Sequence, residues 1–120
     1  MDGIALESRT MSEGSYVAYI LASSSRTLSI GVTSDLRKRV FSHKLQVHEG
    51  FTAQDTCDRL VWYASYPDAS LALAREQQLK EWPAEKLQTL ISAANPEWTD
   101  LSQDWFEAAD FEIVLEQAPL

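Results

Sequence analysis

The sequence predicts an α+β fold in which helices flank a small three-stranded sheet that is antiparallel or mixed. Three observations lead to this class: two β-rich segments separated by a turn, a helical segment followed by a third β-rich segment, and two further helical segments. The 120 residues leave room for one compact domain, and a hydrophobic fraction of 45% is enough to form its core.

Three segments are typical of β-strands because β-branched and aromatic residues fill them: 16–23, 28–32 and 59–66. The stretch SSRT between the first two is a turn signal, so these two segments are expected to form a hairpin. Tyr16 and Tyr19 in the first segment are three positions apart and therefore face opposite sides of the sheet. Only one of these two tyrosines can line a given site.

Three segments have the spacing of apolar residues that is typical of helices: 36–45, 69–82 and 84–94. Thr33, Ser34 and Asp35 provide N-cap residues for the first helix, and Asp68 provides one for the second. We therefore expect the first helix to begin immediately after the second strand.

The second helix carries a predicted apolar stripe, which consists of Leu71, Ala74, Leu79 and Trp82. At about 100° per residue, Arg75 projects toward this stripe, so we expect a structural arginine with an acidic or carbonyl partner. Glu76 lies at the border of the stripe. That position fits a surface acid as well as a carboxylate that faces a shallow groove.

The charge of the chain is unevenly distributed. The net charge is -8, but residues 99–120 alone contain six acidic residues and no Lys or Arg. The middle of the chain is neutral and contains one basic cluster, which consists of Arg37, Lys38, Arg39 and Lys44. The overall acidity weakens long-range attraction to a phosphate backbone without excluding a nucleic-acid partner. We divide the chain into an N-terminal extension (1–15), a domain (16–101) and an acidic C-terminal extension (102–120) that is expected to be docked.

The location expected from the sequence is the cytoplasm. Cys57 is the only cysteine, so no internal disulfide can form and no zinc-binding spacing exists. No run of about 18 apolar residues could span a membrane, and the polar, acidic N-terminus lacks the features of a secretory signal. The sequence does not predict an oligomeric state.

Five stretches of the chain, in order, resemble the GIY-YIG nuclease superfamily and in particular its small single-domain bacterial members. They are VAY (17–19) and SIG (29–31) in place of the two tripeptides of the family, then DLRKRVFSHK, ALAREQQLKEW and NPEWTDL. The resemblance extends from Tyr16 to Leu101. It implies a metal-dependent endonuclease that hydrolyses phosphodiester bonds in DNA with Mg²⁺ or Mn²⁺.

The resemblance also implies roles for individual residues. Glu76 matches the glutamate that holds the metal ion, Tyr19 the tyrosine of the first motif, Arg39 the arginine that contacts the scissile phosphate, and His43 the residue that assists it. Further side chains are expected to contact the substrate: Ser29, Gly31, Arg37, Lys38, Lys44 and Asn95.

The chemistry of these residue types agrees with those roles. Mg²⁺ is usually held by one or two carboxylates together with water and substrate phosphate, which suits a single glutamate. The guanidinium of Arg39 offers a fork of donors that is shaped for phosphate. Arg39 and His43 are four positions apart on a helix and therefore share a face, which places a cation beside a candidate general base.

The chain departs from the family pattern at two places. Ser29 occupies the position of the tyrosine of the second motif. The loop that contains Ala53, Gln54 and Asp55 lacks the lysines of similar proteins, so single-stranded or structured DNA is favoured over plain duplex, with stacking of bases on Phe51. The leading hypothesis is an endonuclease. The alternative is a catalytically degenerate module that binds nucleic acid or a protein partner without cleavage.

Overall fold

The computed structural model describes residues 15–48, 56–107 and 110. Six elements are formed there: β1 (Tyr16–Ala22), β2 (Leu28–Thr33), α2 (Leu36–His48), β3 (Arg59–Tyr66), α3 (Ala69–Glu81) and α4 (Ala84–Ala94). The order of strands and helices and the α+β class predicted from the sequence are confirmed. In the described ranges, no helix is long and apolar enough to cross a membrane.

The three strands form an antiparallel sheet in the order β2-β1-β3, with β1 in the centre. The hairpin between β1 and β2 is closed by Ser23, whose backbone N–H donates to the carbonyl oxygen of Thr27 at 2.9 Å. In the register of the sheet, the Cα of Tyr19 lies opposite Gly31 on one side and opposite Tyr63 on the other. Tyr19 therefore occupies the middle of the sheet.

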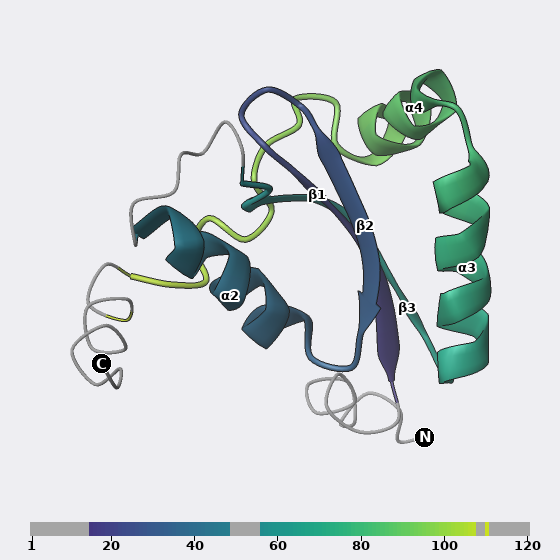
Figure 1. Ribbon diagram of the computed structural model, residues 1–120, viewed down its shortest axis with the longest axis horizontal. Helices are drawn as coiled ribbons and strands as arrows, with labels where there is room; N and C mark the ends of the chain where they lie inside the picture. The colour runs from purple at the N-terminus through teal and green to yellow at the C-terminus, as the bar shows by residue number, and fades with distance from the viewer. Residues whose placement is uncertain (1–14, 49–55, 108–109, 111–120) are drawn as a thin grey trace.

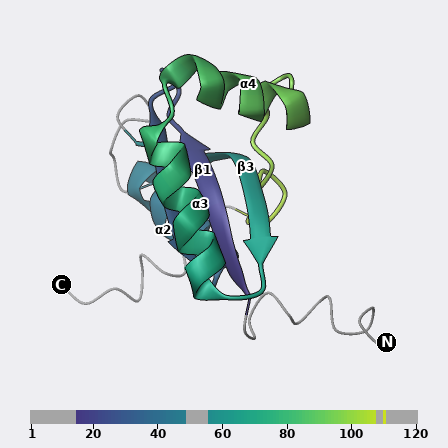
Figure 2. The same ribbon diagram turned by 90° about the vertical axis from the view of Figure 1, so that its right-hand side faces the viewer.

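Helices cover both faces of the sheet. Figure 1 shows α2 on one side of the strands and α3 on the other, and Figure 2 shows α3 lying along the sheet with α4 across its end and α2 behind. The two faces contain separate apolar clusters, because successive residues of a strand point to opposite sides. The cluster beneath α2 contains Val17, Tyr19, Leu21, Leu36, Val40 and Leu60. The cluster beneath α3 and α4 contains Ile20, Ala22, Val61, Leu79, Leu87, Ile91 and Trp98.

The face that α3 buries differs from the predicted stripe. Ala72 and Leu79 are fully buried, whereas Leu71, which was expected in the stripe, is 49% exposed. The positions of α3 that face the sheet are 69, 72, 76 and 79. Their spacing is helical, as predicted, but the buried face is rotated about the helix axis relative to the predicted stripe. Arg75 is half-buried over the rings of Trp62 and Trp82 and donates to the side-chain carbonyl of Gln78. The predicted structural arginine with a carbonyl partner is therefore confirmed.

The chain returns to the α2 side of the sheet after α4. The backbone N–H of Leu101 donates to the carbonyl oxygen of Leu60 at 2.8 Å, and Trp105 and Phe106 pack against the cluster beneath α2. The Phe106 ring meets Phe41 of α2 edge to face, with ring centroids 5.2 Å apart. The beginning of the acidic C-terminal extension is thus packed on α2, and residues 111–120 lie outside the described ranges.

Candidate nucleic-acid-cleaving site

Two grooves flank the end of β2, one on the α2 side and one on the α3 side. The polar groove has a volume of about 410 Å³ and is lined by Thr33, Ser34, Asp35, Lys38, Arg39 and Ser42. The apolar groove has a volume of about 310 Å³ and is lined by Tyr16, Val32, Thr33, Ser34, Ala69, Leu73 and Glu76. Thr33 and Ser34 line both grooves and form the wall between them. The candidate site therefore spans the edge of the sheet from α2 to α3.

The beginning of α2 positions the cations of the polar groove. The Asp35 carboxylate accepts a hydrogen bond from the backbone N–H of Lys38 at 3.1 Å, and its own backbone N–H donates to the hydroxyl of Thr33 at 3.0 Å. This cap confirms the helix start predicted from the sequence and satisfies a backbone donor that the helix leaves unpaired. Lys38 and Arg39 follow in the first turn, where both side chains are exposed.

Tyr19 lies across Gly31 on the α2 side of the sheet and is only 5% exposed. A Cβ atom at position 31 would lie 2.5 Å from the Tyr19 hydroxyl oxygen and 2.8 Å from Cζ, which is closer than real contacts allow. Gly31 is thus needed because the tyrosine ring occupies the space where any other side chain would begin. The substrate contact expected for Gly31 stays a prediction, and the geometry shows that Gly31 accommodates Tyr19. Tyr16 faces the opposite side and lines the apolar groove, as the spacing of the two tyrosines predicted.

Charges from both flanking helices act on Tyr19. Burial raises the pKa of its hydroxyl; Arg39 of α2 opposes this shift, Glu76 of α3 reinforces it, and Lys80 of α3 opposes it. The net shift is upward from 10.0, so Tyr19 keeps its proton at neutral pH. Arg39 and Glu76, two of the residues that the family resemblance implied for catalysis, therefore act electrostatically on a third, Tyr19.

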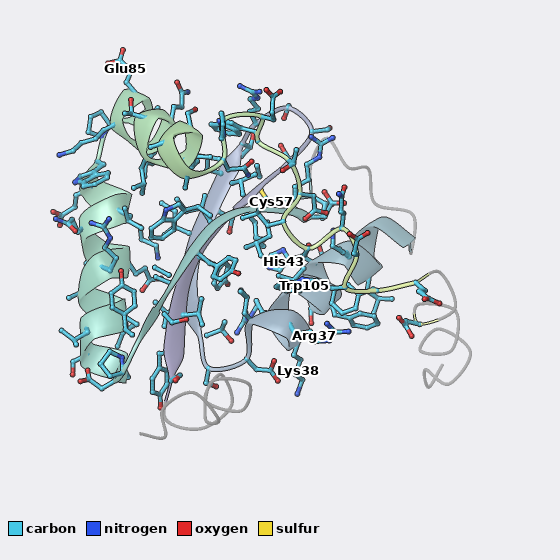
Figure 3. The ribbon with its side chains drawn as sticks, turned by 180° about the vertical axis from the view of Figure 1, so that it is seen from behind. Arg37, Lys38, His43, Cys57, Glu85 and Trp105 are labelled. Carbon is cyan, nitrogen blue, oxygen red and sulfur yellow. The ribbon has the colours of Figure 1, made fainter. Side chains whose placement is uncertain are left out.

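His43 is half-buried on the face of α2 that turns toward the sheet (Figure 3). Burial lowers its pKa below 6.5 and Arg39 lowers it further, while a hydrogen bond with the backbone of Cys57 and the charge of Asp58 partly oppose the shift. The imidazole is consequently neutral at pH 7 and has one nitrogen that can accept a proton. The Cys57 thiol in turn donates to the carbonyl oxygen of Thr27 at 3.4 Å, so His43 lies near the beginning of β2, where Ser29 is located.

Glu76 lies on the buried stripe of α3 and its side chain is 14% exposed, deeper than the border position inferred from the sequence. Its Oε2 pairs with the Lys80 ammonium at 3.0 Å, four residues further along the helix. The sequence interpretation missed Lys80, although the i, i+4 spacing of an acid and a base was visible. Among the described residues, no group of three or more His, Cys, Asp or Glu side chains could hold a metal ion. A cation bound by Glu76 would therefore depend on water and substrate oxygens for its other ligands.

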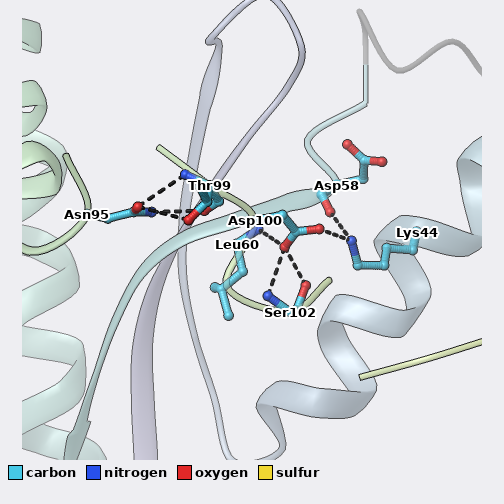
Figure 4. A network of polar contacts seen from close by, with 7 residues as sticks. All are labelled: Lys44, Asp58, Leu60, Asn95, Thr99, Asp100 and Ser102. Carbon is cyan, nitrogen blue, oxygen red and sulfur yellow. Dashed lines mark hydrogen bonds and ion pairs between the residues drawn. The ribbon is translucent and has the colours of Figure 1, made fainter. Parts of the chain in front are cut away.

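The basic cluster of α2 does not form one surface. Arg37 donates to the backbone carbonyl of Trp105 at 2.6 Å, and its guanidinium carbon lies 4.8 Å from the centroid of the Phe106 ring (Figure 3). The Lys44 side chain is 15% exposed and donates to the Asp100 carboxylate and to the backbone carbonyl of Asp58 (Figure 4). Arg37 and Lys44 thus make contacts within the fold, and their expected substrate contacts stay predictions. Lys38 and Arg39 line the polar groove.

Asn95, which was also expected to contact the substrate, makes its hydrogen bonds within the fold. It is 6% exposed, and its amide group donates to the carbonyl oxygen of Val61. The amide group also donates to the carbonyl oxygen of Thr99, and its side-chain oxygen accepts from Thr99 (Figure 4). These bonds fasten the turn after α4 to β3. The side chain has little capacity left for a substrate. Nothing in its sequence neighbourhood distinguishes such an internal role from a role in binding.

Ser29 is half-buried on β2, on the same face of the sheet as Gly31 and Tyr19. The structure thus places it where the family resemblance put the second tyrosine, beside the other site residues. The predicted stacking of bases on Phe51 and the substituted loop positions Ala53, Gln54 and Asp55 lie outside the described residues.

Comparison with known proteins matches this arrangement to one family. The model of the GIY-YIG catalytic domain matches residues 15–88, which contain β1, β2, α2, β3 and α3. A UPF0213 protein of Haloquadratum walsbyi is 33% identical over 93 residues, which cover 78% of this chain and 99% of the relative. The solution NMR structure of a UPF0213 protein from Bacillus halodurans is 20% identical, with a TM-score of 0.48 over 75% of this chain and 97% of that chain. From the match of the family model over most of the chain, this protein belongs to the GIY-YIG family.

Proposed function

We propose that this protein is a divalent-metal-dependent endonuclease that hydrolyses phosphodiester bonds in DNA, with single-stranded or structured DNA favoured over plain duplex. The observation that carries the proposal is the adjacency of the two grooves at the end of β2, because Arg39 lines one, Glu76 lines the other, and Thr33 and Ser34 line both. The GIY-YIG family is a nuclease family. Four residues that its motif implies for catalysis are present in this chain, namely Tyr19, Arg39, His43 and Glu76, whereas Ser29 replaces the tyrosine of the second motif. The cleavage chemistry and the substrate are inferred from these residues.

Arg39 and Lys38 are assigned to the phosphate. They are exposed at the polar groove and no carboxylate pairs with either side chain in the described part of the chain. A guanidinium at this position can form two parallel hydrogen bonds to phosphate oxygens, and a nearby ammonium adds a second positive charge. The charge of Arg39 also acts on Tyr19, so a phosphate bound by Arg39 would lie on the side of the sheet that holds the buried phenol.

Glu76 is assigned to the divalent cation. A single carboxylate at the rim of an open groove fits Mg²⁺ or Mn²⁺, because these ions retain several waters and accept phosphate oxygens as ligands. The bound ion would stabilise the negative charge that develops on phosphorus and on the leaving oxygen. Lys80 pairs with Glu76 at 3.0 Å in this structure and holds the carboxylate at the groove.

His43 and Tyr19 are assigned complementary proton roles. The neutral imidazole of His43 can accept a proton from the attacking water, since its pKa is held below 6.5 by burial and by Arg39. The phenol of Tyr19 remains protonated and can donate a hydrogen bond to the water or to a phosphate oxygen. These roles compensate for the tyrosine that Ser29 replaces.

A second candidate function is binding without cleavage, and Ser29 is the observation that favours it. A serine hydroxyl is shorter than a phenol by a whole ring and is less acidic, so it cannot reach the same point in the site. If His43 does not take over, the domain would retain the polar groove and bind nucleic acid only.

Cleavage assays with purified variants distinguish the two candidates. Single-stranded, duplex and branched DNA are incubated with Mg²⁺ or Mn²⁺ and with wild type, Glu76→Ala or Arg39→Ala. We expect each substitution to lower the cleavage rate about a hundredfold, the size of effect seen when an enzyme loses one group that stabilises the transition state. Glu81→Ala and Arg59→Ala are matched controls, because both residues are exposed and lie outside the two grooves.

The outcomes separate an enzyme from a binding module. Absence of cleavage of all three substrates by wild type would exclude the endonuclease, and undiminished cleavage by Glu76→Ala would identify a contaminant. If Ser29→Tyr gains activity in a wild type that binds but does not cleave, the substitution at position 29 is the cause of the loss.

A further inference from the structure

The apolar groove contrasts with the polar groove beside it. Its lining includes the ring of Tyr16 and the aliphatic side chains of Val32 and Leu73, and its charged lining residue is Glu76. Without a metal ion on Glu76, a phosphate is disfavoured there, because the groove offers a carboxylate and no cationic lining residue. A flat, neutral group with polar edges matches the lining better.

Leu73 gives the groove an unusual exposed apolar wall. Its side chain is 49% exposed although it lies on the helix next to the site. Tyr16 faces it from the start of β1, so an aromatic ring and an aliphatic side chain line the same space. Aromatic rings in nucleic-acid-binding proteins stack on bases of every kind, because each base has a π-face.

The two grooves are close enough for neighbouring groups of one strand. Thr33 and Ser34 line both grooves, so the two grooves are adjacent. A strand whose phosphate lies against Arg39 could therefore turn one base over these two residues into the apolar groove. The hydroxyls of Thr33 and Ser34 then lie where they can contact the polar edge of the base.

We propose that the apolar groove is a subsite for one unpaired nucleobase, next to the phosphate that the polar groove binds. This inference rests on the proposed function and deepens it, since it names the part of the substrate that the α3 side recognises. A base in this groove cannot remain stacked and paired in a duplex. The subsite therefore explains a preference for single-stranded or locally opened substrates through a contact that a duplex cannot make without extruding a base.

The test measures binding separately from cleavage. Fluorescent oligomers of about 12 nucleotides, one a thymidine homopolymer and one an abasic strand with the same number of phosphates, are titrated with the protein in EDTA. We expect wild type to bind the thymidine strand about tenfold to a hundredfold more tightly than the abasic strand, as the loss of one stacked base predicts. The ratio of the two dissociation constants isolates the base, because both strands present the same phosphates.

Leu73→Ser and Leu71→Ser form a matched pair. Both leucines lie on α3 and are 49% exposed, but only Leu73 lines the apolar groove. We expect Leu73→Ser to reduce the preference for the thymidine strand at least threefold and Leu71→Ser to leave it unchanged. Tyr16→Ala should reduce it further, and Leu73→Ser carries the test if Tyr16→Ala does not fold.

The results for the subsite and for the nuclease can be told apart. Equal preferences in the two leucine variants would overturn the subsite, and so would equal binding of both strands by wild type. A preference that depends on Leu73, found in a protein that cuts no strand with Mg²⁺ or Mn²⁺, would support the subsite while the nuclease proposal fails. Cleavage without any base preference would leave the nuclease and overturn the subsite.

Discussion

Arg37 and Arg39 lie in the same turn of α2 but face different parts of the molecule. Arg39 lines the polar groove, and its charge acts on Tyr19 and His43. Arg37 instead donates to the Trp105 carbonyl and lies over Phe106. The two lysines differ in the same way, because Lys38 lines the polar groove whereas Lys44 forms an ion pair with Asp100. One face of the helix thus belongs to the site and the other to the fold.

This difference shows that a run of cations in a sequence does not define a cationic surface. Successive helical residues are about 100° apart, so a cluster of basic residues is distributed around the axis. Contacts with distant segments then decide which charges remain available. Here Trp105 and Asp100, which are far from α2 in sequence, accept hydrogen bonds from Arg37 and Lys44. These two cations therefore face residues 100–106 and not the polar groove.

The largest expected loss of stability follows from Asp100→Ala, which removes the ion-pair partner of Lys44 on α2. The Asp100 carboxylate accepts hydrogen bonds from the Lys44 ammonium, from the backbone N–H of Leu60, and from the N–H and hydroxyl of Ser102. Burial raises the pKa of this carboxyl, but the bonds from Lys44 and Ser102 and the charge of Lys44 lower it below 3.8. Its removal leaves Lys44 largely buried without its ion-pair partner. We expect the free energy of unfolding to fall by about 3 kcal/mol, measured by urea denaturation.

The control for this prediction is Asp104→Ala, which removes an exposed acid from the same segment. Its effect should stay within about 0.5 kcal/mol. Similar losses of stability in the two variants would show that the Asp100 network does not anchor the segment.

Gly31→Ala, on β2, should disturb the candidate site by displacing Tyr19. The new Cβ would begin 2.5 Å from the Tyr19 hydroxyl, so the ring must move. We expect a loss of about 2 kcal/mol in the free energy of unfolding, which is typical of overpacking, and at least a tenfold loss of cleavage rate. A Gly31→Ala protein with wild-type stability and rate would show that Tyr19 does not need its present position.

The pH dependence of the cleavage rate tests the proton roles assigned to His43 and Tyr19. His43 has a pKa below its ordinary 6.5 and Tyr19 has one above its ordinary 10.0. The base form of His43 is therefore present above pH 6.5 and is lost as the pH falls through the lowered value, while Tyr19 stays protonated up to about pH 10. The rate should fall on the acid side and be level between pH 7 and about pH 9. The acid limb should disappear in His43→Gln, and its persistence there would assign it to another group.

The lowered pKa of His43 also makes the free energy of unfolding fall at acid pH, as it does the cleavage rate. The unfolded chain binds a proton at His43 near pH 6.5, before the folded protein does. The contribution of the neutral histidine to folding is thus complete above pH 6.5 and decreases as the pH falls through its lower folded value.

The parts of the fold that local sequence determines could be predicted. β3 begins and ends at residues 59 and 66, as predicted from β-branched and aromatic residues, and the caps at Asp35 and Asp68 act within three residues of their own position. Tyr19 was predicted to face the side opposite Tyr16 because alternation along a strand needs no tertiary information.

The internal contacts that the sequence did not predict depend on partners far away in the chain. Lys44 is separated by 56 residues from Asp100, and Asn95 by 34 from Val61, so neither partnership was visible in the local pattern. Leu71 was placed in the stripe because the spacing of apolar residues defines a helical period without fixing which face meets the sheet. The reason for Gly31 required the register that places it opposite Tyr19.

The matched arginines of α2 provide the most direct test of the division between the two faces. The cleavage rate of a single-stranded oligonucleotide with Mn²⁺ is measured for Arg37→Ala and Arg39→Ala, with the unfolding of each variant followed by urea. We predict that Arg39→Ala loses about a hundredfold in rate and Arg37→Ala less than threefold, since only Arg39 reaches the groove. An equal loss in the two variants, or a larger loss in Arg37→Ala, would contradict the assignment of the two faces.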